Sequence, residues 1–137
     1  MKRTDLAYIA GIIDGEGSIY SGHRKGRYQI WLSIQMTDRV ALEFVQSLFG
    51  GKILLMRQKG NRRDIYRWRL TGYQIHPILT SLSPYLLTKL PQAKIALRIL
   101  ESHTPWKHYT PMEQFLQEAD ALAIRTLNKR GKEFTGA

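Results

Sequence analysis

The sequence predicts an α+β domain in which one four-stranded antiparallel sheet is covered on one side by helices. Segments with helical and strand periodicity follow one another in the order α, β, β, α, β, β and then helices. Glycines stand between the paired strands, and the length of 137 residues is that of one domain. We expect this domain over residues 1–127 and a disordered basic tail over residues 128–137, where the periodicity is lost.

An apolar segment near the start predicts the first helix. Thr4 can cap it, Asp5 suits its first turn, and the segment extends from Leu6 to about Asp14. One side of this helix has so little side-chain bulk that another backbone could approach closely. Packing against the chain's own sheet and packing against a second copy are both open; the residues on that side are Ala7, Ala10, Gly11 and Asp14.

The first predicted hairpin joins residues 18–24 to residues 28–36. In its second strand Ile30 and Leu32 alternate with polar neighbours, which is the period of a strand buried on one face. Trp31 falls on the polar face, where it could contact a ligand or be covered by neighbouring side chains.

A helix and a second hairpin are predicted next. Thr37 is expected to cap a helix that runs through Leu48 and is stopped by glycines. The second hairpin joins residues 52–59 to residues 64–71. In its later strand an apolar face alternates with a cationic one, which carries Arg67 and Arg69.

The remainder of the domain reads as helical. Helices are predicted over residues 73–82 and 91–102. Thr110 and Glu113 then have the spacing of a capping box, which begins a last helix that we expect to end near Leu127.

Positive charge gathers on the predicted sheet. The formal net charge is +10, and the region from Ser21 to Leu70 holds eleven basic residues and three acidic ones. A two-stranded ribbon fits the DNA major groove, where Arg and Gln read bases, while loop cations can hold phosphates. An ordinary polar sheet face is the alternative. The predicted DNA-binding residues are Tyr20, His23, Arg24, Lys25, Arg27, Gln29, Trp31, Ser33, Gln35, Gln58, Lys59, Arg62, Arg63, Arg67 and Arg69.

Two acids separated by one glycine end the first helix. Residues i and i+2 of a helix point about 200° apart, so Asp14 and Glu16 cannot chelate one ion while both are helical. We expect Gly15 and Gly17 to break the helix, so that the Glu16 carboxylate and the Gly15 carbonyl offer hard oxygen ligands for Mg²⁺. Asp14 would stay at the helix end as a hydrogen-bond acceptor. A plain turn from helix to strand is the alternative.

One carboxylate per chain is a poor magnesium site, and strand cleavage usually needs two ions. If two copies pack their small-residue faces together about a two-fold axis, the two Glu16 side chains meet. The same dimer would align two basic sheets along one duplex. We therefore expect a homodimer on double-stranded DNA.

Composition excludes several classes of protein. The chain has no cysteine, so a disulfide scaffold and a thiol nucleophile are excluded. Acid and glycine interrupt the first apolar run, and no run approaches eighteen apolar residues. We expect no membrane partner and an intracellular protein, in the cytoplasm or in the organelle or nucleoid of its host, rather than a secreted one.

Three segments carry a resemblance to a known family. IAGIIDGEG, from Ile9 to Gly17, resembles the LAGLIDADG motif of the homing endonucleases. The resemblance continues through QMTDR at 35–39 and LTKLPQAKIALRILE at 87–101, and it covers roughly residues 6–101. It implies that family's αββαββα fold. The single motif resembles the homodimeric branch, whose members are typically encoded in mobile introns and cleave long, nearly palindromic DNA sites.

The resemblance also implies roles for particular residues. Glu16, in place of the motif's usual Asp, matches the ligand of the divalent ions, and Gly15 matches the position whose carbonyl assists. Lys89 matches a lysine that stabilises phosphate charge or positions water. Asp38 and Arg39 fall where the family has a polar residue near the attacking water and a basic residue.

The function implied is a site-specific DNA endonuclease that cuts both strands with Mg²⁺. Mn²⁺ is expected to substitute, and Ca²⁺ to bind without supporting cleavage. A maturase that assists splicing of intron RNA and a non-catalytic nucleic-acid-binding regulator are the alternatives. The maturase would share the fold and the basic surface.

Overall fold

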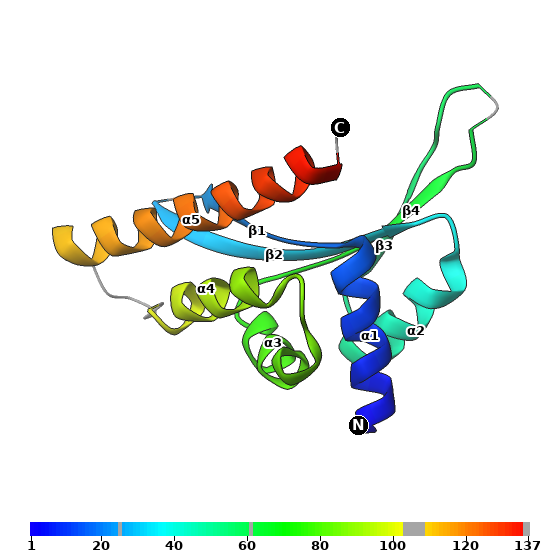
Figure 1. Ribbon diagram of the computed structural model, residues 1–137, viewed down its shortest axis with the longest axis horizontal. Coiled ribbons are helices and arrows are strands. Elements are labelled where there is room, and N and C mark those ends of the chain that lie inside the picture. Colours follow the sequence, from blue (N-terminus) through cyan, green and yellow to red (C-terminus); the bar gives the residue numbers. More distant parts are fainter. Residues whose placement is uncertain (25, 61, 103–108, 136–137) are drawn as a thin grey trace.

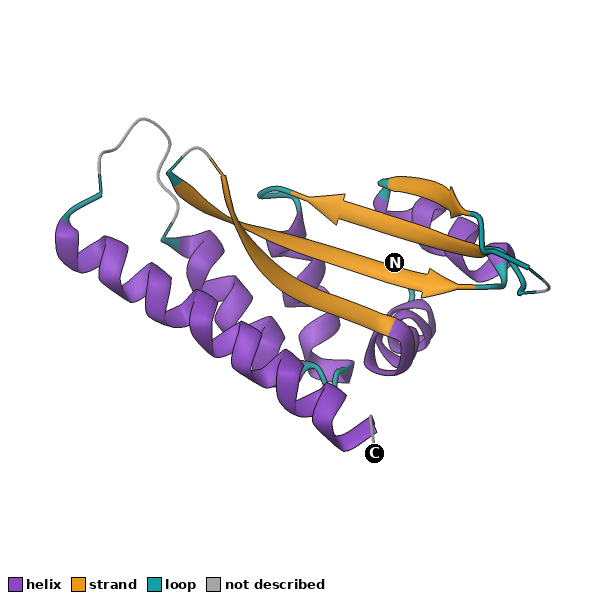
Figure 2. Ribbon diagram, turned by 90° about the horizontal axis from the view of Figure 1, so that it is seen from above, coloured by secondary structure: helices purple, strands orange, loops and turns teal. Residues whose placement is uncertain are grey.

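The computed structural model describes residues 1–24, 26–60, 62–102 and 109–135. Helices α1 to α4 lie under one face of a four-stranded sheet, and α5 runs along the β1 edge (Figures 1 and 2). The predicted α+β class and the covering of one sheet face are confirmed. The elements are α1 Arg3–Glu16, β1 Gly17–Arg24, β2 Arg27–Met36, α2 Arg39–Phe49, β3 Lys52–Met56, β4 Ile65–Thr71, α3 Ile75–Leu82, the 3₁₀ turn η1 Ser83–Tyr85, α4 Leu90–Glu101 and α5 Pro111–Thr135.

The sheet has the strand order β1-β2-β4-β3, and every neighbouring pair is antiparallel. Ile19, Leu32 and Leu70 form one cross-strand row, and all three are buried against the helices. Since side chains alternate along each strand, the next row, with Ser33 and Arg69, lies on the opposite, uncovered face. The predicted division of the sheet into an apolar and a cationic face is confirmed.

Trp68 of β4 closes the core at the connection between α2 and β3. Its side chain is fully buried, and its indole N–H donates to the Gly50 carbonyl at 2.7 Å. Gly51 has a φ of +92°, and a Cβ there would lie 2.6 Å from the indole nitrogen. The connection therefore needs glycine at residue 51 both for its backbone conformation and for the space that the indole occupies.

The caps of two helices differ from those predicted. Helix α1 begins at Arg3 after Lys2, whose backbone is extended, so Thr4 lies inside the helix and does not cap it. Helix α2 is capped by Asp38 rather than Thr37, because the Asp38 carboxylate accepts from the Val40 N–H at 2.9 Å. A carboxylate one residue nearer the helix displaces the hydroxyl from this role.

Helix α5 is longer than predicted. The capping box is confirmed, since Thr110 and Glu113 exchange hydrogen bonds at 3.1 and 3.2 Å. The helix continues to Thr135, and so extends into the segment from residue 128 that the sequence predicts to be a disordered tail. Asn128 bonds the helix to the domain: its amide donates to the Ile19 carbonyl at 3.0 Å and accepts from Gln92 at 3.4 Å. Within the described residues, none of the helices is long and apolar enough to cross a membrane.

The burial of Trp68 predicts that the same substitution costs more stability on the covered face of the sheet than on the uncovered face. Trp68→Phe should lower the free energy of unfolding by about 2 kcal/mol, because it leaves the Gly50 carbonyl without its donor and opens a small cavity. The same change at Trp31, on the uncovered face, should cost less than about 1 kcal/mol. Urea unfolding followed by far-ultraviolet circular dichroism measures both. Equal costs at the two positions would contradict the assignment of the faces.

Candidate metal centre and nucleic-acid interface

Glu16 stands at a sharp corner between α1 and β1. A Cβ on Gly17 would lie 2.7 Å from both the Cα and the carbonyl oxygen of Ile13, which is closer than real Cβ atoms come. Only glycine can therefore take the chain from the helix into the strand here. Gly15 stays helical and is not the break that the sequence predicts. The corner leaves the Glu16 side chain exposed at the end of the helix.

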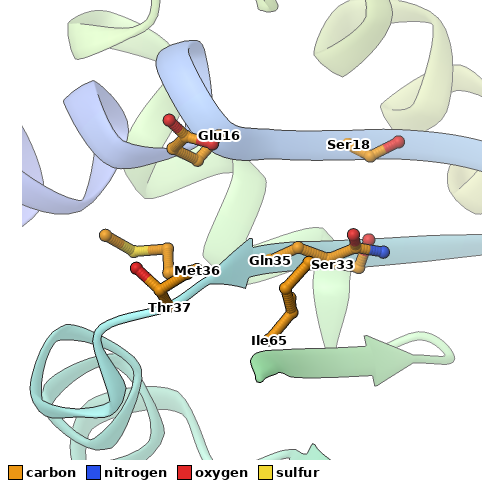
Figure 3. Close-up of a pocket in the computed structure, with 7 residues that line it drawn as sticks. All are labelled: Glu16, Ser18, Ser33, Gln35, Met36, Thr37 and Ile65. Carbon is orange, nitrogen blue, oxygen red and sulfur yellow. The ribbon is translucent and has the colours of Figure 1, made fainter. Parts of the chain in front are cut away.

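The Glu16 side chain opens into a hollow of about 670 Å³ (Figure 3). Glu16 and Ser18 come from the α1–β1 corner, while Gln35 and Thr37 come from the end of β2 and the residues after it. Ser33, Met36 and Ile65 complete the lining. The hollow thus combines one carboxylate with hydroxyl and amide groups, which are hydrogen-bonding groups suited to phosphate and water. Ser18 and Thr37 were missed from the sequence because each looked like an ordinary strand or cap residue.

The donor set fits a shared divalent cation. Among the residues that the structure describes, the Glu16 carboxylate makes no hydrogen bond or ion pair, and no three His, Cys, Asp or Glu side chains gather where they could hold a metal. The carbonyl of Gly15 lies in the last turn of α1, where carbonyls lack partners within the helix. Such hard oxygens suit Mg²⁺ or Ca²⁺, but one chain offers too few of them to fill six or more positions. The remaining ligands would have to come from a second copy, nucleic acid or water.

Asp14 fixes the Glu16 helix to the segment that carries Lys89. Its carboxylate accepts from the Leu87 N–H at 2.8 Å and from the Lys89 N–H at 2.9 Å. The predicted role of Asp14 as an acceptor at the helix end is confirmed. The backbone of Lys89 is thus bonded to Asp14, which lies two residues before Glu16 in the chain. The Lys89 side chain does not line the hollow.

Asp38 and Arg39 are not brought to this hollow. Asp38 caps α2 and lines a separate depression between α1 and α2. Arg39 pairs with Glu43 at 2.8 Å on the surface, and its guanidinium lies 5.6 Å from the Tyr66 ring centre. Gln35 and Thr37, from the same stretch of chain, line the hollow where Asp38 and Arg39 were expected.

The small-residue side of α1 is rotated relative to the prediction. The Ala10 side chain is completely buried within the chain, so it cannot contact a second copy. Asp14 is partly exposed, and its carboxylate is engaged by the backbone N–H groups of residues 87 and 89. The exposed small residues are Ala7, Gly11 and Gly15, four residues apart on one side of the helix. No atom lies within 4 Å of a Cβ built on Gly11 or Gly15.

The uncovered sheet face carries most of the predicted DNA-binding residues. The Trp31 ring there stacks on Tyr20 with centroids 6.2 Å apart, and the Arg69 guanidinium is 4.9 Å from its centre. A Cβ on Gly22 would come within 3.1 Å of the indole nitrogen, so the absence of a side chain at residue 22 makes room for the ring. Trp31 is therefore half-buried by its neighbours on the uncovered face.

The ends of the hairpins hold the other predicted residues. Arg24 and Arg27 form the last cross-strand pair of β1 and β2, and the His23 ring meets the Tyr28 ring edge-on at 4.9 Å. Between β3 and β4 the side chains of Lys59, Arg62 and Arg63 are exposed, and Gln58 is half-buried. Gln29 stands opposite Gly22. Lys25 lies outside the described residues.

Two further residues on this face were missed. Lys52 stands opposite Arg69 and Leu54 stands opposite Arg67, so both lie on the uncovered side of β3. The segment KILLM is almost wholly apolar, and it gives no alternation from which its register could be read. Pairing with β4 alone decides which of its side chains face outward.

In this chain a helix ends in an acid at the edge of an antiparallel sheet that bears cations. The chain has the fold of the LAGLIDADG homing endonucleases. No family model matches the chain. It is 29% identical over 103 residues to the DNA endonuclease I-CreI of Chlamydomonas reinhardtii, a match that covers 70% of this chain and 62% of that protein. The resemblance predicted from the three segments is confirmed.

Two solved structures show the likeness of fold. The homing endonuclease I-CvuI, crystallised with its DNA target and calcium, superposes with a TM-score of 0.73 at 23% identity, covering 90% of this chain and 82% of that one. The archaeal intron-encoded homing endonuclease I-Vdi141I, complexed with DNA, gives a TM-score of 0.73 at 19% identity and covers 90% and 84% of the two chains.

The two hydrogen bonds of Asp14 predict that this carboxylate stabilises the joint between α1 and the segment before α4. Asp14→Asn keeps the size but turns one acceptor into a donor that faces an N–H, so the free energy of unfolding should fall by about 1–2 kcal/mol. Asp5→Asn removes the same charge from the first turn of α1 and should cost about 0.5 kcal/mol. Denaturant unfolding of both variants decides the matter; equal effects would mean that charge alone, and not the pair of bonds, is responsible.

Proposed function

We propose that this protein is a site-specific DNA endonuclease of the intron-homing kind, which binds a long pseudo-palindromic duplex as a homodimer and hydrolyses both strands with divalent metal ions. The observation that carries the proposal is the unpaired Glu16 carboxylate, exposed at the edge of a basic sheet face with no helix over it. The names of its relatives support it, since I-CreI is a DNA endonuclease and I-CvuI and I-Vdi141I were solved with DNA.

The uncovered sheet face suits duplex DNA. The major groove admits a ribbon of strands, and its base edges can be read by the Gln and Arg side chains that stand on β2 and β4. Exposed cations at the hairpin ends, such as Arg24 and Arg62, lie where a duplex following the sheet would present phosphates. The DNA-binding role is thus divided between the middle of the sheet and its ends.

Dimerisation would complete the metal centre. Ala7, Gly11 and Gly15 leave the backbone of α1 open to close approach by a second copy. In a two-fold arrangement of these helices the two corners meet, so that each chain contributes its Glu16 and the carbonyl of its Gly15. The two basic faces then lie along one duplex, which explains the preference for a pseudo-palindromic site.

The chain's own residues would bind and position the reacting groups. A divalent ion, when bound, lowers the pKa of a water molecule and neutralises charge on the scissile phosphate. Glu16 and the Gly15 carbonyl would hold the ions, and Lys89 would add positive charge near the phosphate. Asp14 keeps the Lys89 backbone beside the Glu16 helix. Ser18 and Thr37 offer hydroxyls that can orient water in the hollow. Mg²⁺ is the proposed ion, Mn²⁺ a substitute, and Ca²⁺ a ligand that supports binding without cleavage.

Glu16→Gln tests the metal centre. It keeps the shape of the side chain but removes its charge, so Mg²⁺-dependent cutting should fall by at least about 100-fold while DNA affinity changes little. The measurement is selection of cleaved duplexes from a randomised library, followed by binding of the selected site in Ca²⁺. Glu43→Gln, which removes an exposed acid from α2, is the control and should cut normally.

Other outcomes would redirect the assignment. If Glu16→Gln cuts as fast as the parent chain, the proposed centre is wrong. If the parent chain retains selected duplexes without ever cutting them, the regulator is favoured. If it retains a structured intron RNA in preference to any duplex, the maturase is favoured.

Gly11→Leu tests the dimer. The position is open in the single chain, so the variant should fold with unchanged or slightly raised stability, since leucine favours helix more than glycine by about 0.8 kcal/mol. Its added bulk should nevertheless convert the dimer to a monomer in sedimentation velocity and abolish double-strand cleavage. Val40→Leu adds bulk at an exposed position of α2 and should leave the dimer intact. A dimeric Gly11→Leu variant would place the interface elsewhere.

A further inference from the structure

Gln35 and Arg67 form a hydrogen-bonded unit on the uncovered face of the sheet. They stand directly opposite each other in the β2–β4 ladder. With the amide turned so that both groups are satisfied, the Gln35 oxygen accepts from Arg67 Nε at 3.0 Å and from an Arg67 Nη at 2.6 Å. Both bonds converge on one amide oxygen, and a hydrogen bond from an ionised donor is stronger than one between neutral groups. The pair therefore meets a ligand as one unit rather than as two independent side chains.

This pairing changes what Gln35 can offer. A free Gln side chain presents one acceptor and one donor, the combination that reads adenine. Here the acceptor is taken by the guanidinium. The groups that the pairing does not use are the amide NH₂ of Gln35 and the remaining N–H groups of Arg67, and all of these are donors.

A unit that only donates distinguishes the four bases. In the major groove guanine presents two acceptors, N7 and O6, whereas adenine presents one acceptor and one donor. Cytosine presents a donor, and thymine one acceptor beside a methyl group. Guanine is the base whose edge matches the unit fully, and adenine and cytosine place a donor against a donor.

We propose that the Gln35–Arg67 pair is a guanine-reading subsite, and that the hydrogen bond between the two side chains excludes adenine by occupying the only acceptor of the Gln35 amide. The proposal rests on the proposed function, since it needs a duplex on this face. Gln35 also lines the hollow of Glu16, so the guanine it reads belongs to the part of each half-site nearest the cut (Figure 3).

The proposal predicts different outcomes for the two partners. In Arg67→Met the Gln35 oxygen is released, and the preference at one position of each half-site should change from guanine to adenine, by about tenfold. In Gln35→Met the Arg67 guanidinium is released; a free Arg reads guanine through both acceptors, so guanine should remain preferred there. A simple loss of charge or packing would not produce this opposite pair of results.

Arg69→Met is the matched control. Arg69 lies two residues along the same strand and on the same face, but its guanidinium stacks on Trp31 instead of pairing with an amide. Its loss should leave the guanine preference at the Gln35–Arg67 position unchanged. Circular dichroism of each variant verifies that the fold is retained, which is expected because all three side chains lie on the uncovered face.

The experiment is selection of bound duplexes from a randomised library in Ca²⁺, with sequencing of the retained pool for the parent chain and the three variants. Because this selection measures binding, its result can be interpreted even if the chain does not cut DNA. A guanine-to-adenine change in Arg67→Met alone supports the proposal. Retention of guanine in that variant, or uniform weakening across all sequences with a smaller salt dependence, as for a phosphate contact, overturns it. A parent chain that retains no duplex preferentially overturns the proposed function, and the subsite with it.

Discussion

The corner at Gly17 is the constraint on which the rest of this structure depends. The helix must turn into a strand where the Ile13 backbone leaves no room for even a methyl group. Because the turn occurs within one residue, the last helical side chain, Glu16, stands at the edge of the sheet instead of being buried beneath it. The same corner sets the start of β1, and through the β1–β2 register it sets which residues of β2 face outward.

Helix α1 serves three different environments with 14 residues. One side, with Ile9 and Ile13, packs into the core of the domain. Another side exposes Ala7, Gly11 and Gly15, whose small size fits close contact with a second backbone. The C-terminal end carries Asp14, which bonds inward to the chain, and Glu16, which is left exposed. Helix α1 therefore both packs the core of the domain and presents the exposed Glu16 carboxylate at the edge of the sheet.

The two faces of the sheet divide stability from recognition. The covered face is filled by apolar side chains and by Trp68, whose polar atom is satisfied by a backbone carbonyl. On the uncovered face the cations interact mainly with neutral partners: Arg69 with the Trp31 ring and Arg67 with the Gln35 amide. These contacts orient the guanidinium groups without neutralising them. The positive charge of the face is therefore preserved for a polyanionic ligand.

The sequence alone determined the order of the elements, the two faces of β2 and β4, and the acidic end of the first helix. These follow from local periodicity and from glycine placement, which need no knowledge of distant residues. It could not determine the facing of KILLM, because an unbroken apolar segment has no alternation and only pairing with β4 sets its register. Nor could it show that Ala10 faces the core, since one small residue resembles another until the rotation of α1 is fixed by packing. Three sets of contacts join parts of the chain that are far apart in sequence: the bonds of Asp14 to residues 87 and 89, the bond of Asn128 in α5 to Ile19, and the Gln35–Arg67 pair. Such contacts exist only once the tertiary structure brings their partners together.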